Sequence, residues 1–157
     1  MLIAVMSAGC YESAFPLDPA PTAALDPTLL GTWRCIAPNG DDEAVSMRVS
    51  RVREGVDGVS MQERGKDPDR YEVYASVVGG NTVLNIRDMS ATGSKPWVFG
   101  RSVLLRPDVL QIQIASDNSL KGVETSPEAV RRAIARRQSD PGLFQDGFTC
   151  VRTKDAR

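Results

Sequence analysis

Short stretches of this chain alternate between apolar and polar residues. The alternation is most regular at residues 109–115, where Leu110, Ile112 and Ile114 are separated by glutamines, and it recurs at residues 45–50 and 71–77. A period of two residues is typical of a β-strand with one buried face and one solvated face. Weaker candidates bring the expected number of strands to about eight, at residues 30–35, 58–63, 82–88, 97–106 and 147–152.

Turn-forming residues separate these candidate strands. The pairs Asn39-Gly40, Glu54-Gly55, Asp67-Pro68 and Gly79-Gly80 all favour tight reversals. Short connections join antiparallel neighbours. The sequence therefore predicts a mainly β fold, an up-and-down antiparallel barrel of about eight strands.

One helix is expected, directly before the last strand. Ser126 is suited to the N-cap, Pro127 to the first helical position, and Asp140-Pro141 to the end. Ala129, Val130, Ala133 and Ile134 form its apolar stripe. The arginines on its other face either are solvated or contact anionic lipid.

Composition excludes several classes of function. The chain has 157 residues with 19 basic and 20 acidic side chains, and it has no histidine. The length fits one domain, and a net charge of −1 gives no basic excess for nucleic acid. Without histidine there is no Ser-His-Asp triad, His-ligated zinc or His general base. The acidic run at residues 39–43 lacks the ligand spacing of a calcium loop. We expect no catalysis, no cofactor and no metal.

The first ten residues, M-L-I-A-V-M-S-A-G-C, form an uncharged apolar run that ends in small residues and a cysteine. Taken alone, such a run also fits a frayed terminus or a first strand. It resembles the end of a bacterial lipoprotein signal peptide, with Ala8, Gly9 and Cys10 matching the lipobox and Ser7 in place of the usual leucine. The resemblance implies a start upstream of Met1 and acyl chains such as palmitate on Cys10. It also implies the bacterial envelope, and Tyr11 after the cysteine favours the outer membrane.

Four prolines, Pro16, Pro19, Pro21 and Pro27, interrupt the next segment. Proline holds the chain near polyproline II, in which residues 11–28 would span roughly 55 Å. We expect a semi-rigid tether between the membrane and a single barrel domain. The predicted organisation is signal peptide and lipobox (1–10), tether (11–28) and barrel (29–157).

With Cys10 assigned to lipid, Cys35 and Cys150 remain as one pair. An exported protein in an oxidising envelope would oxidise that pair. The first and last strands of an eight-stranded meander are antiparallel neighbours, so a Cys35–Cys150 disulfide would close the barrel seam. The alternative is two buried free thiols in a cytosolic protein.

Gly31-Thr32-Trp33 on the first strand resembles the Gly-x-Trp of lipocalins, in which the tryptophan closes one barrel end beneath an arginine of the last strand. If Cys35 faces Cys150, paired residue numbers add up to 185, which places Trp33 opposite Arg152. We therefore predict the Arg152 guanidinium within about 6 Å of the Trp33 ring.

Residues 97–105 suggest a ligand site. Trp97, Phe99, Val103 and Leu105 share one strand face, which we expect to line the barrel interior. Arg101 lies on that face too, so either the strand bulges there or a buried arginine meets a carboxylate. Trp97, Phe99 and Arg101 are the candidate ligand contacts.

The whole chain is most similar in character to uncharacterised bacterial lipoproteins built as small barrels. We expect a non-catalytic, lipid-anchored, lipocalin-like barrel that binds a small apolar or amphipathic ligand. The alternative is a structural or protein-interaction lipoprotein with a filled barrel and no ligand.

Overall fold

The computed structural model describes residues 9–38, 43–123 and 125–154. Within this part of the chain the strands are β1 (Glu12–Ser13), β2 (Gly31–Ile36), β3 (Val45–Arg53), β4 (Val56–Gln62), β5 (Asp69–Val78), β6 (Asn81–Asp88), β7 (Trp97–Arg106), β8 (Val109–Ala115) and β9 (Phe144–Arg152). The helices are the 3-10 turn η1 (Pro27–Leu29), α2 (Asp117–Leu120) and α3 (Pro127–Arg136).

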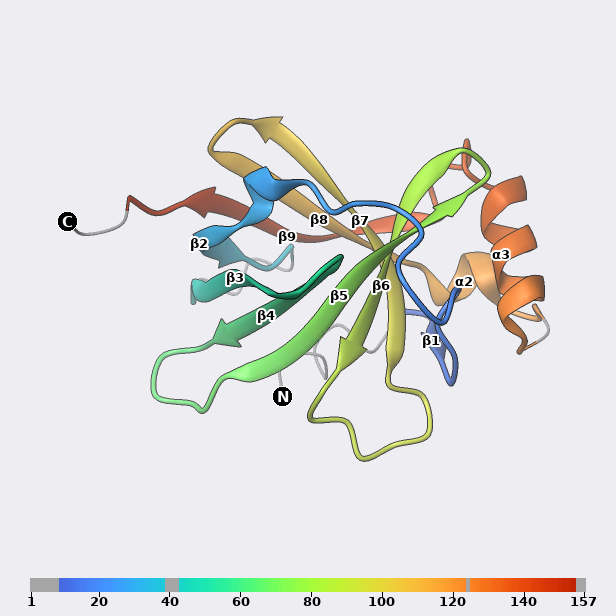
Figure 1. The fold of residues 1–157 in the computed structure, drawn as a ribbon, viewed down its shortest axis with the longest axis horizontal. Coiled ribbons are helices and arrows are strands. Elements are labelled where there is room, and N and C mark those ends of the chain that lie inside the picture. The colour runs from blue at the N-terminus through green and yellow to red at the C-terminus, as the bar shows by residue number, and fades with distance from the viewer. Residues whose placement is uncertain (1–8, 39–42, 124, 155–157) are drawn as a thin grey trace.

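Strands β2 to β9 form a closed barrel (Figure 1). Each strand pairs antiparallel with the next one along the chain, and β9 returns to pair with β2. The predicted eight-stranded up-and-down barrel is confirmed. The predicted helix is α3, which stands before β9, and the Ser126 hydroxyl accepts a hydrogen bond from the Ala129 amide at 3.1 Å.

The protein has two main apolar clusters, one inside the barrel and one outside it. The inner cluster includes Trp33, Met47, Leu110, Phe148 and the two half-cystines. The outer cluster packs α2 and α3 against the outer face of the sheet, beside the β5–β6 hairpin, and includes Val83, Phe99, Leu120, Ile134 and Leu143. Strands β5 to β8 therefore bury side chains on both faces.

The segment expected to be a free tether lies instead on the barrel. We call residues 10–29 the strap; in Figure 1 it is the blue trace that leads from β1 across the molecule to β2. The Tyr11 amide donates to the Ala115 carbonyl at 2.9 Å, and β1 pairs with the start of β7. Further along, the Thr22 amide donates to the Ala75 carbonyl at 2.9 Å. The strap thus supplies backbone partners to strand edges that the barrel leaves unpaired.

Side chains of the strap explain why its prolines do not keep it in solvent. Tyr11, Leu17 and Leu25 are buried, the first two in the outer cluster and Leu25 among Val73, Ala75 and Leu84. Proline removes amide donors, so a proline-rich segment needs few backbone partners when it lies against a protein surface. Burial of three large apolar side chains stabilises that position.

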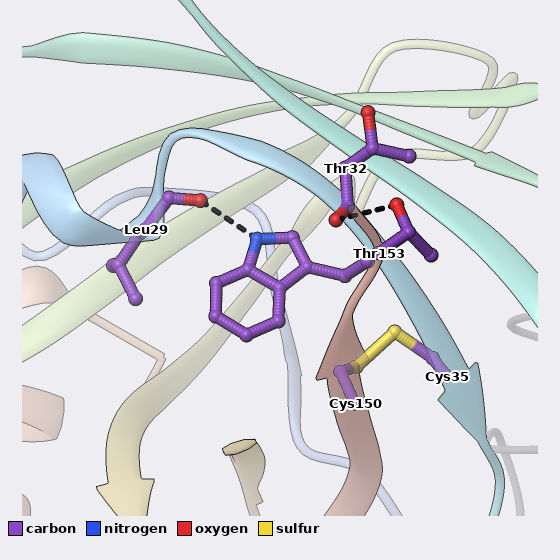
Figure 2. The surroundings of a disulfide bond; sticks show 6 residues. Leu29, Thr32, Cys35, Cys150 and Thr153 are labelled. Atoms are coloured by element: carbon purple, nitrogen blue, oxygen red, sulfur yellow. Dashed lines mark hydrogen bonds between the residues drawn. A yellow bond between two sulfur atoms is a disulfide. The ribbon is translucent and has the colours of Figure 1, made fainter. Parts of the chain in front are cut away.

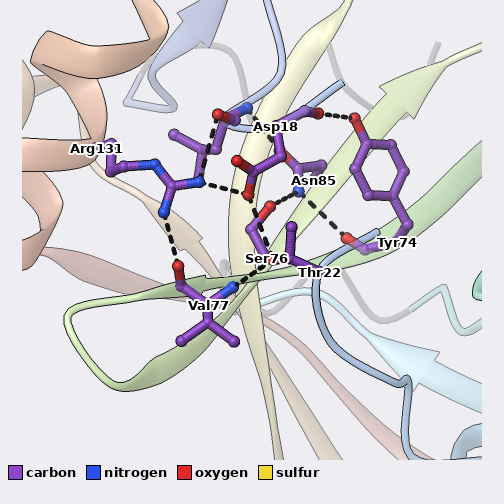
Figure 3. A network of polar contacts seen from close by, with 8 residues as sticks. Asp18, Thr22, Tyr74, Ser76, Val77, Asn85 and Arg131 are labelled. Atoms are coloured by element: carbon purple, nitrogen blue, oxygen red, sulfur yellow. Dashed lines mark hydrogen bonds and ion pairs between the residues drawn. The ribbon is translucent and has the colours of Figure 1, made fainter. Parts of the chain in front are cut away.

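A polar network fixes the middle of the strap (Figure 3). The buried Asn85 side chain accepts a hydrogen bond from the Leu17 amide at 2.8 Å and donates to the Ser76 hydroxyl at 2.8 Å. The Tyr74 hydroxyl donates to the Asp18 carbonyl, and the Asp18 carboxylate pairs with Arg131 of α3. The network therefore joins the strap to both the barrel and the helix.

Candidate functional site

The barrel closes where β2 meets β9, which we call the seam. Cys35 and Cys150 are directly opposite each other in the register and form a disulfide (Figure 2). The same register places Trp33 opposite Arg152. The predicted pairing of the first and last strands is confirmed, and so is the predicted disulfide.

One end of the barrel is closed around Trp33. Its indole is completely buried and donates to the Leu29 carbonyl at 2.9 Å (Figure 2). The Arg152 guanidinium carbon lies 4.2 Å from the centroid of the indole, so the predicted cation–π contact is present. Arg152 also donates to the Leu30 carbonyl at 2.9 Å and to the Thr28 carbonyl.

Gly31 makes this arrangement possible. Its φ angle is +125°, and a Cβ atom there would lie 2.9 Å from the arginine nitrogen Nη1 of Arg152. A larger residue would be strained in that backbone conformation and would displace the guanidinium from the ring. Local packing therefore explains the Gly-x-Trp sequence at this barrel end: the glycine leaves room for the Arg152 guanidinium over the tryptophan ring.

The barrel interior holds a cavity of about 120 Å³. Inward side chains of β3 to β9 and residues of the strap form its wall, which includes Leu25, Leu29, Met47, Met61, Tyr71, Val98, Ser102, Leu110, Ile112 and Phe148. Almost all of this lining is apolar. A dry apolar cavity of about 150 Å³ holds a benzene-sized molecule, so the space suits a small hydrocarbon group.

Few polar groups reach the cavity wall. Asp57 is buried and forms an ion pair with Arg51, which faces it across β3 and β4. Burial, together with the nearby carboxylates of Asp69 and Asp88, strongly raises the pKa of the Tyr71 phenol. Tyr71 therefore presents an uncharged hydroxyl to the cavity.

The structure overturns the expected orientation of β7. Trp97, Phe99 and Arg101 do not line the cavity; the inward side chains of this strand are Val98 and Ser102. Phe99 belongs to the outer cluster, and the Arg101 guanidinium carbon lies 5.0 Å from the Phe144 ring centroid. The register shift in this strand falls between Leu104 and Arg106, so Arg101 is neither at a bulge nor inside the barrel.

The reason for the misplaced face is that β7 is apolar on both sides. The outer cluster covers one face, and the cavity wall uses the other, so alternation does not distinguish inside from outside. Gly100 lies close to β8, where a Cβ atom would be 2.6 Å from the Gln113 carbonyl oxygen, but this close approach does not indicate which face of β7 points inward. Met47 and Met61, which the sequence did not single out for the site, also line the cavity.

Cys10 belongs to the cavity wall and is a free, half-buried thiol. Burial and the neighbouring carboxylate of Glu12 raise the pKa of this thiol. Its backbone forms a β-bridge with Ser116, at the end of β8. Residues 1–8, including Ser7 and Ala8 of the expected lipobox, and residues 39–42 of the acidic run lie outside the described residues.

Within the described residues, no three His, Cys, Asp or Glu side chains are grouped closely enough to hold a metal ion. No helix in that same part of the chain is both long and apolar enough to cross a membrane. No family model matches the chain, and neither curated proteins nor solved structures yield a match.

Proposed function

We propose that this chain is a lipid-anchored envelope protein of bacteria, attached through Cys10, whose barrel binds a small apolar or amphipathic ligand without catalysis. The observation that carries the ligand proposal is the apolar cavity inside the barrel. Its volume of about 120 Å³ suits a group of a few carbon atoms. Pockets for drug-sized ligands are larger, roughly 300–1,000 Å³, so we propose that only part of a longer amphipathic ligand enters.

Two features support the anchor and the compartment. Cys10 follows the small residues of a lipobox-like sequence, and Cys35 and Cys150 are disulfide-bonded. Disulfides persist in oxidising compartments such as the periplasm, the compartment that we propose for this lipoprotein. Replacement of Cys10 by alanine should release the protein from the membrane fraction, and retention there would contradict the anchor.

Xenon is a direct probe of the cavity because it enters dry apolar cavities of this size. Xenon chemical shifts, titrated against the Cys10→Ala protein, should report saturable binding. The Ser102→Phe variant fills the cavity from β7 and should abolish it. Leu105→Phe is the matched control, since Leu105 is exposed on the same strand. Equal binding to all three proteins would contradict a barrel site.

The exposed aliphatic side chains on the outer face of the seam favour a second candidate, a protein-interaction lipoprotein. Ile36 and Val151 are about half exposed and share this face with Val109. A photoreactive amino acid that replaces Val151 in living cells tests this second candidate by crosslinking to any bound protein. A specific crosslinked protein that is lost with Val109→Lys would favour interaction, and crosslinks unaffected by that change would not.

A further inference from the structure

The position of Cys10 connects the proposed anchor with the proposed ligand site. Cys10 lines the cavity inside the barrel, and it also lines an open hollow outside it. We propose that one acyl chain carried by Cys10 enters the barrel, so that the protein binds part of its own anchor. This inference rests on the proposed function, because it requires Cys10 to be acylated.

The backbone holds Cys10 at that boundary. The Tyr11 amide, directly after the cysteine, donates to the Ala115 carbonyl at 2.9 Å. This hydrogen bond remains when a signal peptide that ends at Gly9 is removed, and it keeps Cys10 next to the end of β8. A chain attached to its sulfur begins at the cavity wall, and entry costs little loop-closure entropy.

The cavity wall matches a hydrocarbon chain rather than a charged ligand. Among the described residues that line it, Asp57 is the only charged one, and its carboxylate is paired with Arg51. Apolar surface transferred from water into such a space is stabilised roughly in proportion to its area. An unpaired charged group would instead lose its hydration without a partner.

The far end of the cavity limits how much of a chain enters. β8 begins opposite Val151, next to Arg152, and ends at Ala115, next to the Cys10 bridge. Cys10 and the Trp33–Arg152 closure are therefore at opposite ends of this strand, and Leu29, whose carbonyl accepts from the Trp33 indole, lines the cavity. The observed space holds only a short stretch of chain, and Met47 and Met61 are flexible side chains that could enlarge it.

Two hollows near the start of the strap offer room for the polar part of the anchor. They have volumes of about 350 and 540 Å³ and share Glu12 and Lys95 in their walls. The larger one also includes Cys10 and Lys121. Ester groups next to the sulfur would lie in this wet, mixed-charge region, and the remaining chains would leave from it to the membrane.

A photoreactive fatty acid tests the proposal on the full chain. Bacteria that acylate lipoproteins are fed a diazirine-containing fatty acid, the protein is purified and irradiated, and its peptides are mapped by mass spectrometry. We expect crosslinks within β3, β8 and β9, at inward residues such as Met47, Ile112 and Phe148. Ser102→Phe should lose these crosslinks and keep those to membrane lipid, whereas Leu105→Phe should keep both.

The outcomes separate the inference from the proposed function. Crosslinks confined to lipid and outer-face residues of an acylated protein would overturn the inference and leave the anchor standing. An unmodified Cys10 in the mass spectrum would overturn both. As an independent readout, the acylated protein should fail to bind xenon where Cys10→Ala binds it, and equal binding by the two would contradict occupancy by the chain.

Discussion

The seam and the strap hold the same barrel in different ways. At the seam, β2 and β9 pair in continuous register, share a disulfide and enclose a tryptophan that is completely buried. The strap contacts the barrel through single hydrogen bonds, a two-residue strand and three buried apolar side chains, and one ion pair at its middle joins it to α3. The seam joins the first and last strands of the barrel to each other, whereas the strap is held by separate contacts along its length.

This difference separates global from local stability. Loss of the seam opens a closed sheet, so its cost falls on the whole cooperative unit. We expect loss of one strap contact to free a surface segment and to leave the eight-stranded barrel paired. Local opening below the global free energy is typical of surface segments that are held by fewer contacts than paired strands. Four predictions test whether the two regions behave in these ways.

The largest effect is expected from the disulfide. It joins residues 115 positions apart, and a loop of that size gives a stabilisation of about 4–5 kcal/mol in the chain-entropy model. The double variant Cys35→Ser/Cys150→Ser should lose that amount in urea unfolding, with one transition for all probes. Cys10→Ser is the control and should lose little. If the double variant loses less than about 1 kcal/mol of unfolding free energy, the disulfide does not act mainly by restricting the unfolded chain.

Asn85 tests the strap. Its completely buried side chain binds the Leu17 amide and the Ser76 hydroxyl, so Asn85→Ala leaves both without that partner. We expect a loss of about 2–3 kcal/mol, the cost of buried polar groups left unsatisfied. Limited proteolysis should then cut within residues 14–24 while the barrel stays folded. The exposed Asn118→Ala is the control, and loss of barrel structure at the same denaturant as strap cleavage would contradict a separable strap.

Arg152 tests the seam without touching the disulfide. Arg152→Ala removes the stacking on Trp33 and the donors to the Leu30 and Thr28 carbonyls, with an expected loss of about 2 kcal/mol. Arg152→Lys keeps a cation but not the planar fork, and we expect it to recover about half of that loss. Tryptophan fluorescence during urea unfolding measures both. Full recovery by lysine would mean that charge alone, and not the two-carbonyl geometry, holds this end.

Sequence patterns predicted the seam well because its determinants are periodic and paired. Regular alternation identified strands such as β8, and the even number of strands brought Cys35 next to Cys150. From that one pair the register placed Trp33 opposite Arg152. Each step used a relation that strand geometry itself imposes, so one correct pairing fixed the neighbouring ones.

The strap and β7 were predicted poorly for a different reason. Prolines describe the local conformation of residues 11–28, but not the surface against which Leu17 and Leu25 lie. Asn85 looks like an ordinary strand residue, and nothing in its neighbourhood identifies Leu17 as a partner 68 positions away. On β7, apolar residues on both faces left the inward set undecided. These features depend on tertiary contacts that no local period records.

The smallest effect concerns pH and again separates the two regions. Burial alone would raise the pKa of the Asp18 carboxyl, but hydrogen bonds from Ser76 and Arg131 and the charge of Arg131 outweigh it, and the pKa is lowered. When the folded-state pKa is lowered, the ionised carboxylate stabilises the protein at pH values above the unfolded pKa of about 3.9, and that contribution disappears as the pH falls through the folded pKa.

Because Asp18 is partly exposed, we expect this contribution to be less than about 1 kcal/mol, and the strap should become more sensitive to pepsin below about pH 4. Asp18→Asn should be sensitive already at pH 5, with a protease active there, and should lose most of the additional change on acidification. In the described part of the chain, Arg152 contacts the Trp33 ring and the Leu30 and Thr28 carbonyls. The fluorescence of Trp33, measured in a Trp97→Phe background because Trp97 packs against Tyr74, should therefore not follow the Asp18 titration. A change in that fluorescence with the same midpoint as strap cleavage would mean that strap and seam open together.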